Sequence, residues 1–285
     1  MTSEDILSQP QPPPDERVAY GAESNQFLEV RLPTVKSPYP ALLNIHGGFW
    51  RAKYDLAHAG HLCASLRAAG IATFNAEYRR VGNPGGGWPG TFEDIRSAYQ
   101  FLRQHHVRFQ FDPDRLVVMG HSAGAQLALC LAAHESSVRN VISLAGVVDL
   151  KPAFALQLSH GAVAEFLGGG PDAVSDHYRE ADPMQLSIPQ AHQCLLHGRE
   201  DDIVPPEFSR SYFERKKKAG EMVQLVEIPN AGHFDLIDPA SEAFKQVTSA
   251  LLTARELTIV DSPFEPSPNP ILPLLAPLCH CRNQG

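Results

Sequence analysis

The sequence predicts an α/β protein whose central, mostly parallel sheet is covered by helices on both faces. Between residues 41 and 253, short apolar runs alternate with longer segments in which apolar residues recur at helical spacing. This alternation is typical of parallel strands joined by crossover helices. The composition agrees with a globular fold, since 43% of the residues are hydrophobic and 20% are charged. A chain of 285 residues is long enough to bury a large core in one such domain.

Short apolar runs bounded by turn-forming residues indicate the strands. The first, ALLNI, lies between Tyr39-Pro40 and Gly47-Gly48. Strands are expected at 41–45, 71–74, 115–119, 138–144, 194–196 and 223–228.

Helical spacing indicates the helices between these strands. Leu62, Leu66 and Ala69 share one face of the first helix, and Gly70 follows as a C-cap. Helices are expected at 58–69, 92–105, 123–133, 207–219 and 240–253.

Proline is concentrated near the two ends of the chain. Ten of the 24 prolines lie within 10–14 and 263–277, where fixed φ angles and missing donors oppose regular structure. We therefore expect a proline-rich N-terminal tail over 1–16, an α/β domain over 17–262 and a proline-rich C-terminal tail over 263–285. Within the domain, residues 150–189 break the alternation and carry several large apolar side chains. This segment is expected to form a small helical cap insertion over the sheet.

The net charge and the cysteine content indicate which partners the protein binds and in which cellular compartment it is expected. The net charge is −8 and the pI is near 5.9, which argues against a protein that binds nucleic acid. Five scattered cysteines do not form a disulfide framework, so a cytoplasmic protein with reduced thiols is expected. No apolar run is long enough to span a membrane, and the first residues do not resemble a secretory signal, so no membrane association is expected. Oligomeric state is not indicated.

The pentapeptide Gly120–Gly124 carries the strongest chemical signal. It matches G-x-S-x-G, follows a predicted strand and precedes a predicted helix. In that context Ser122 lies on a sharp strand-to-helix turn, and the glycines leave room where strand and helix approach each other. Ser122 is therefore the candidate nucleophile.

A serine hydroxyl needs a base and an acid that orients the base. His233 follows the predicted strand 223–228 and is preceded by Gly232, which makes it the candidate base among 13 histidines. Asp201 and Asp202 both follow the strand 194–196 and compete for the role of the acid. All these residues lie just past strand ends, where sites form in open α/β sheets.

The segment HGGFW at 46–50 follows the first expected strand. Its glycines allow the backbone to approach a reacting carbonyl, and a tetrahedral intermediate needs N–H donors aimed at its oxyanion. Gly48, Phe49 and Ala123, the residue after the nucleophile, are the candidate oxyanion-hole donors.

Together these motifs resemble the α/β-hydrolase superfamily over about residues 18–255, and within it the esterase/lipase branch with small carboxylesterases and kynurenine formamidases. EYRR at 77–80, followed by Trp88-Pro89 and Asp94, is similar to the Y-R-x-x-P…F-P…D segment of that branch. Phe49 stands where the hormone-sensitive-lipase pattern commonly has a third glycine, so HGGFW is more similar to the formamidase and small-esterase side.

The resemblance implies a serine hydrolase that cleaves small carboxylic esters through an acyl-enzyme, with no cofactor and no metal. The family spacing H-G-x-x-D-x-x-V-P favours Asp201 over Asp202 as the acid. Trp50, Trp88, Phe154 and Phe166 are expected to line an apolar substrate pocket. An arylformamidase acting on an N-formyl aromatic amide is the alternative. An oligopeptidase-like hydrolase and a non-catalytic binding module are minor alternatives.

Overall fold

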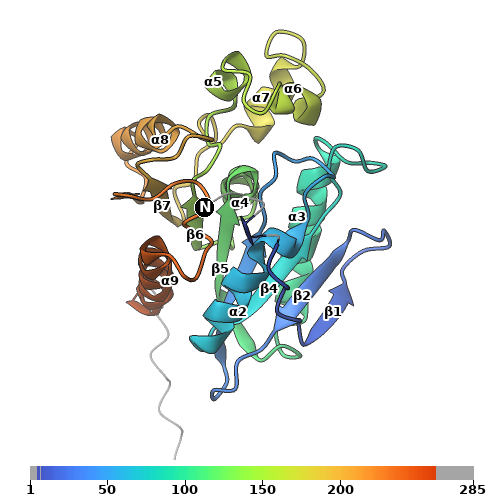
Figure 1. The fold of residues 1–285 in the computed structure, drawn as a ribbon, viewed down its shortest axis with the longest axis vertical. Helices are drawn as coiled ribbons and strands as arrows, with labels where there is room; N and C mark the ends of the chain where they lie inside the picture. The colour runs from blue at the N-terminus through green and yellow to red at the C-terminus, as the bar shows by residue number, and fades with distance from the viewer. Residues whose placement is uncertain (1–4, 7, 261–285) are drawn as a thin grey trace, which may run out of the picture.

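A computed structural model describes residues 5, 6 and 8–260 of the chain. Its centre is an eight-stranded sheet with the strand order β1-β2-β4-β3-β5-β6-β7-β8 (Figure 1). The strands are β1 (Glu16–Ala19), β2 (Phe27–Arg31), β3 (Tyr39–Ile45), β4 (Ala72–Glu77), β5 (Phe111–His121), β6 (Asn140–Leu144), β7 (His192–Gly198) and β8 (Val223–Ile228).

The sheet is parallel from β4 to β8, and β2 pairs antiparallel with both β1 and β4. Because parallel strands end at the same edge, the loops after β3, β5, β7 and β8 meet at that edge. The α/β prediction is thus confirmed, and all six expected strands are present. Strands β1 and β2 were not expected, because they are short and mix charged with apolar residues, as in ERVA.

Helices cover both faces of the sheet, as predicted. Helices α2 and α9 pack on one face, and α3, α4 and α8 pack on the other. The helices are η1 (Leu56–Ala59), α2 (Gly60–Ala68), α3 (Gly90–Gln104), α4 (Ala123–His134), α5 (Leu150–Ala155), α6 (Ala162–Leu167), α7 (Ser175–Ala181), α8 (Glu207–Lys218) and α9 (Glu242–Val260).

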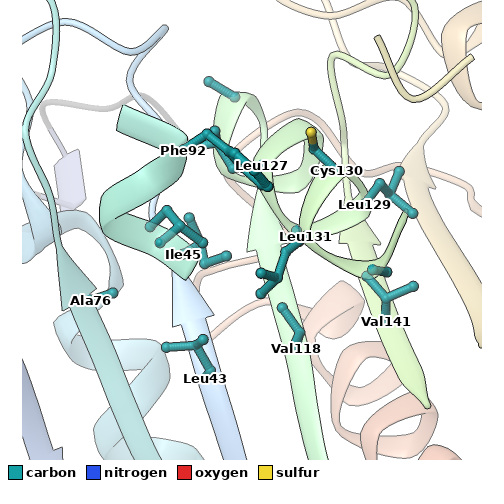
Figure 2. Packing of buried hydrophobic residues seen from close by; sticks show 14 of the residues in the cluster. Leu43, Ile45, Ala76, Phe92, Val118, Leu127, Leu129, Cys130, Leu131 and Val141 are labelled. Carbon is teal, nitrogen blue, oxygen red and sulfur yellow. The ribbon is translucent and has the colours of Figure 1, made fainter. Parts of the chain in front are cut away.

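Neighbouring residues of the central strands point to opposite faces and build two cores. Leu42 packs with the side chains of α2 and α9, whereas Leu43 packs with those of α3 and α4. Figure 2 shows the second core, where Val118 of β5 lies beneath Leu131 of α4 and Leu43 lies beside Val118 on the neighbouring strand. Helix α4 is buried on all sides, from Ala123 through Ala132, which explains its alanine- and leucine-rich sequence.

The predicted insertion is observed as three short helices, α5, α6 and α7, which gather beyond α4 at one end of the molecule (Figure 1). Phe166 and Leu167 of α6 and Tyr178 of α7 are buried in the core shared with α3 and α4. The insertion is therefore packed onto the domain. Its limits at 150 and 189 stay a prediction.

The N-terminal proline segment lies against the sheet rather than apart from it. Arg31 donates a hydrogen bond to the carbonyl of Pro12, and the amide of Asp15 donates to Val30. Ile6 is buried in the core beside α2. The predicted C-terminal tail at 263–285 lies outside the described residues, as does its Cys279-His280-Cys281 segment. Within the described ranges, no helix is long and apolar enough to cross a membrane.

Candidate active site

Ser122 occupies the turn between β5 and α4. Its backbone has φ 58° and ψ −120°, a strained conformation for a residue with a side chain. The turn is crowded by backbone: a Cβ on Gly120 would lie 2.1 Å from the carbonyl oxygen of Gly124, and one on Gly124 would lie 2.2 Å from that of Ile45. Glycine is thus required at both positions, for the reason expected from the motif.

His233 follows β8 and is hydrogen bonded to Asp201. Its Nδ1 lies 2.7 Å from Asp201 Oδ2. Because a carboxylate only accepts, Nδ1 carries the proton and Nε2 keeps a lone pair. His121 supports this arrangement, since its Nε2 lies 3.0 Å from the carbonyl oxygen of His233 and its ring centroid lies 4.6 Å from that of His233.

Asp201 is held on both of its oxygens. Oδ1 accepts from the amides of Ile203 and Val204, at 2.9 and 2.8 Å, and Oδ2 also lies 3.2 Å from His197 Nε2. Burial by itself would raise the pKa of the Asp201 carboxyl. The hydrogen bonds from His197 and His233 outweigh burial and hold the pKa well below its usual range. Asp201 is therefore ionised and oriented towards His233.

Asp202 is exposed at the rim and has no hydrogen bond with His233 among the described residues. Of the two adjacent carboxylates, Asp201, which the family spacing favours, is the one that is hydrogen bonded to His233.

Ser122 and His233 line one cavity of about 780 Å³. Gly48 and Phe49 line it as well, so loops from three strand ends meet there. The remaining lining residues are Gly47, Tyr54, His58, His121, Ser159, Glu200, Asp202, Ile203, Gly232, Phe234 and Asp235.

The loop after β3 lies directly against Ser122. A Cβ on Gly47 would lie 3.0 Å from the Ser122 Cβ. Gly48, Phe49 and Trp50 have positive φ angles of 106°, 50° and 56°. Within the described part of the chain, neither the Gly48 nor the Phe49 amide donates a hydrogen bond to protein. Ala123 begins α4, where first-turn amides have no partner inside the helix. The three predicted donors are thus near Ser122 and available.

The four aromatic residues predicted to line the pocket lie elsewhere, and this prediction is corrected. Trp50 and Phe166 are fully buried and stack on each other, with centroids 4.5 Å apart, so neither ring faces the cavity. Trp88 packs edge-on against Phe166, and Phe154 packs against Tyr178. Trp50, Trp88 and Phe166 join the cap insertion to the domain, and Phe154 packs within the insertion. Large rings gain more by burial than by facing water.

Several lining residues were missed in the sequence. Tyr54 and His58 lie on the segment after the oxyanion loop, which carries no recognisable motif. His58 is buried beside Phe234, at a centroid distance of 6.2 Å. Burial lowers the pKa of His58. Phe234 could have been found, because it directly follows the candidate base.

The strand order and the serine at the turn after β5 define an α/β-hydrolase. The chain belongs to the BD-FAE family, whose model matches residues 28–215.

Three known proteins illustrate the relationship. Esterase LipC of Mycobacterium tuberculosis is 28% identical over 250 residues, which cover 79% of this chain and 60% of LipC, so the chain corresponds to only part of that protein. Kynurenine formamidase of Salmo salar is 24% identical over 254 residues, covering 82% of this chain and 80% of the formamidase. The structure of the Thermogutta terrifontis esterase Est2 with propionate bound has a TM-score of 0.66 at 24% identity, covering 89% of this chain and 96% of Est2.

Proposed function

We propose that this protein is a serine hydrolase that cleaves small carboxylic esters through an acyl-enzyme. The observation that carries the proposal is the 2.7 Å hydrogen bond from His233 Nδ1 to Asp201, at a cavity that Ser122 and His233 both line. A hydroxyl, an imidazole and a buried carboxylate in this order form the usual acyl-transfer triad. The esterase names of relatives such as LipC support the same reaction class.

Each residue has a distinct task in this reaction. Ser122 Oγ attacks the ester carbonyl while His233 Nε2 takes its proton, and Asp201 stabilises the imidazolium that forms. His233 then gives the proton to the leaving alcohol, and an acyl group stays on Ser122. Water, deprotonated by His233, attacks this acyl group and releases the acid and the free serine.

The oxyanion of both tetrahedral intermediates is stabilised by the amides of Ala123 and of Gly48 or Phe49. These amides have no other protein partner among the described residues, so they need not break a bond in order to donate. The loss of one such donor typically lowers kcat by about 10²–10³.

The alternative is hydrolysis of an N-formyl aromatic amide, which uses the same machinery. The relative named kynurenine formamidase, with 80% of its length covered, keeps this substrate class in consideration. We favour esters because LipC is the more similar relative, at 28% against 24% identity. The cytoplasmic location inferred from the cysteines stays a prediction.

The test compares p-nitrophenyl esters of increasing acyl length with N-formylkynurenine, using the wild-type protein and Ser122→Ala. We expect the short esters to be hydrolysed fastest, and Ser122→Ala to lower kcat by about 10⁶. Turnover of the formamide that exceeds the best ester by orders of magnitude would instead support the alternative. Near wild-type turnover by Ser122→Ala would exclude the proposed mechanism.

A further inference from the structure

The candidate oxyanion loop is held in a strained shape. Gly48, Phe49 and Trp50 are three consecutive residues with φ between 50° and 106°, and two of them carry large side chains. Such conformations persist only when the surrounding structure fixes them. The amide of Arg51 donates to the Gly48 carbonyl and that of Val81 donates to the Trp50 carbonyl, which fixes the loop's backbone on one side.

The Trp50 side chain fixes the loop on the other side. It is fully buried and lies flat on Phe166 of the cap insertion, with an interplanar angle of 7°. Its indole N–H donates a 3.0 Å hydrogen bond to Gln126 Oε1. The stacking limits movement of the ring along its normal, and the hydrogen bond limits its rotation within its own plane. Trp50 therefore anchors the loop at the residue that follows Phe49, whose amide is a candidate oxyanion donor.

Gln126 connects this anchor to the nucleophile and to the cap insertion. It lies on α4, one helical turn after Ser122, and is fully buried. Its Nε2 donates a 2.7 Å hydrogen bond to the carbonyl of Ala181, at the end of α7. With Oε1 occupied by Trp50 and Nε2 by Ala181, the side chain has one defined orientation.

A packing role alone does not require glutamine here. The other buried residues of α4 are alanine, leucine, glycine and cysteine, and a methionine would fill similar space. The amide group joins α4, which begins directly after Ser122, to Trp50 of the oxyanion loop and to Ala181 at the end of α7.

We propose that Gln126 is a positioning residue, which aims the oxyanion loop at the Ser122 site through its hydrogen bond to Trp50. This inference rests on the proposed function, since it concerns the same reaction. Gln126 touches neither the substrate nor the reacting atoms.

The test uses Gln126→Met and Trp50→Phe, singly and together, with a short p-nitrophenyl ester. Trp50→Phe removes the indole N–H and keeps a ring against Phe166. The matched control is Gln193→Met on β7, because Gln193 is also buried and its hydrogen bonds do not involve the loop: it accepts from Tyr212 and donates to Ile188 and Glu221. Each variant is measured for kcat, KM, inhibition by a trifluoromethyl ketone that forms a tetrahedral adduct with a serine, and melting temperature.

We expect each single variant to lower kcat about tenfold, less than the 10²–10³ lost with a whole oxyanion donor. Affinity for the trifluoromethyl ketone falls in proportion and KM stays within about twofold. The double variant is no more than about twofold worse than either single variant, because both remove the same hydrogen bond. Gln193→Met lowers the melting temperature and leaves kcat near wild type.

Wild-type kcat in Gln126→Met, or a double variant that loses about 100-fold, would overturn the inference while leaving the ester hydrolase intact. If Gln126→Met does not fold, Trp50→Phe decides alone, and an unchanged kcat in that variant overturns the inference. Failure of the proposed function has a different signature, because the wild-type protein would then hydrolyse no ester.

Discussion

The substitution Asp201→Asn, compared with Asp202→Asn, tests which of the two adjacent carboxylates is the acid that orients His233. Asparagine keeps the size of the side chain but replaces one acceptor oxygen by an NH₂ donor. In the structure, Oδ1 accepts from the amides of Ile203 and Val204, and Oδ2 accepts from His233. Oδ2 also lies 3.2 Å from His197 Nε2, which keeps the Val204 carbonyl as an acceptor at 2.9 Å if Oδ2 is replaced. If the NH₂ group faces His233, Nδ1 has to become an acceptor and the proton moves to Nε2, where it blocks the lone pair that receives the serine proton. If the asparagine flips, its NH₂ faces two backbone donors instead, at a cost of about 1–3 kcal/mol for each unsatisfied group.

The first orientation is therefore favoured, and the base is held in the wrong tautomer. In serine proteases, this change lowers kcat by about 10⁴. At 1.36 kcal/mol for each factor of ten, the barrier rises by about 5.4 kcal/mol. Asp202→Asn removes an exposed charge that has no hydrogen bond with His233 among the described residues, so its kcat is expected to stay within about threefold of wild type.

The assay is steady-state hydrolysis of p-nitrophenyl acetate at pH 8 by the two variants and the wild-type protein. Circular dichroism checks that both variants are folded. The reasoning is refuted if Asp202→Asn loses more activity than Asp201→Asn, or if Asp201→Asn stays within tenfold of the wild-type protein.

Two further predictions concern stability. Because the folded-state pKa of Asp201 is lowered, its contribution is present above the unfolded value of about 3.9 and is lost as pH falls towards the folded value. In urea unfolding, the free energy of unfolding of the wild-type protein is therefore expected to exceed that of Asp201→Asn by about 2 kcal/mol at pH 7 and by less at pH 3.5. A difference that grows as the pH falls would contradict this prediction. Gly124→Ala places a Cβ 2.2 Å from the Ile45 carbonyl oxygen and is expected to lower the free energy of unfolding by about 3 kcal/mol. The control is Gly169→Ala, whose Cβ would have its nearest neighbour 3.4 Å away, so its stability should change little. Equal losses of stability in the two variants would contradict the steric argument.

The central sheet could be predicted from the sequence because its strands are buried on both faces. Such strands form nearly continuous apolar runs, such as ALLNI at 41–45 of β3, where all of these residues are buried. The edge strand β8 was also predicted, with the bounds that it has in the structure, although its sequence VQLVEI mixes polar with apolar residues. The two N-terminal strands were missed because FLEVR of β2 places charged residues among apolar ones, and because β1 alternates half-buried with exposed residues over only four positions. No local pattern separates such a strand from a loop. Its position depends on pairing with β2, which is a non-local property.

The candidate triad could be predicted for a similar reason. Topology brings the carboxyl ends of parallel strands together, so residues just after β5, β7 and β8 converge whatever their separation in sequence. The position after β7 alone left both Asp201 and Asp202 open, and the family spacing favoured Asp201, which is the carboxylate hydrogen bonded to His233 in the structure.

The substrate-facing surface could not be predicted. Trp50 directly follows the oxyanion loop and was expected to face the substrate, but its ring turns inward onto Phe166. Aromatic residues are suited to both positions, and sequence spacing does not distinguish a ring in a pocket from a ring in the core.

The most direct test of the central claim is labelling with a fluorophosphonate, followed by mass spectrometry of the digested protein. The reagent reacts with a serine whose hydroxyl is activated by a neighbouring base. We predict one covalent adduct on Ser122, loss of ester hydrolysis in step with labelling, and labelling slowed by orders of magnitude in Asp201→Asn. An ester hydrolase whose Ser122 stays unmodified, or which is labelled at the same rate with and without Asp201, would contradict the assignment of the three residues to one catalytic unit.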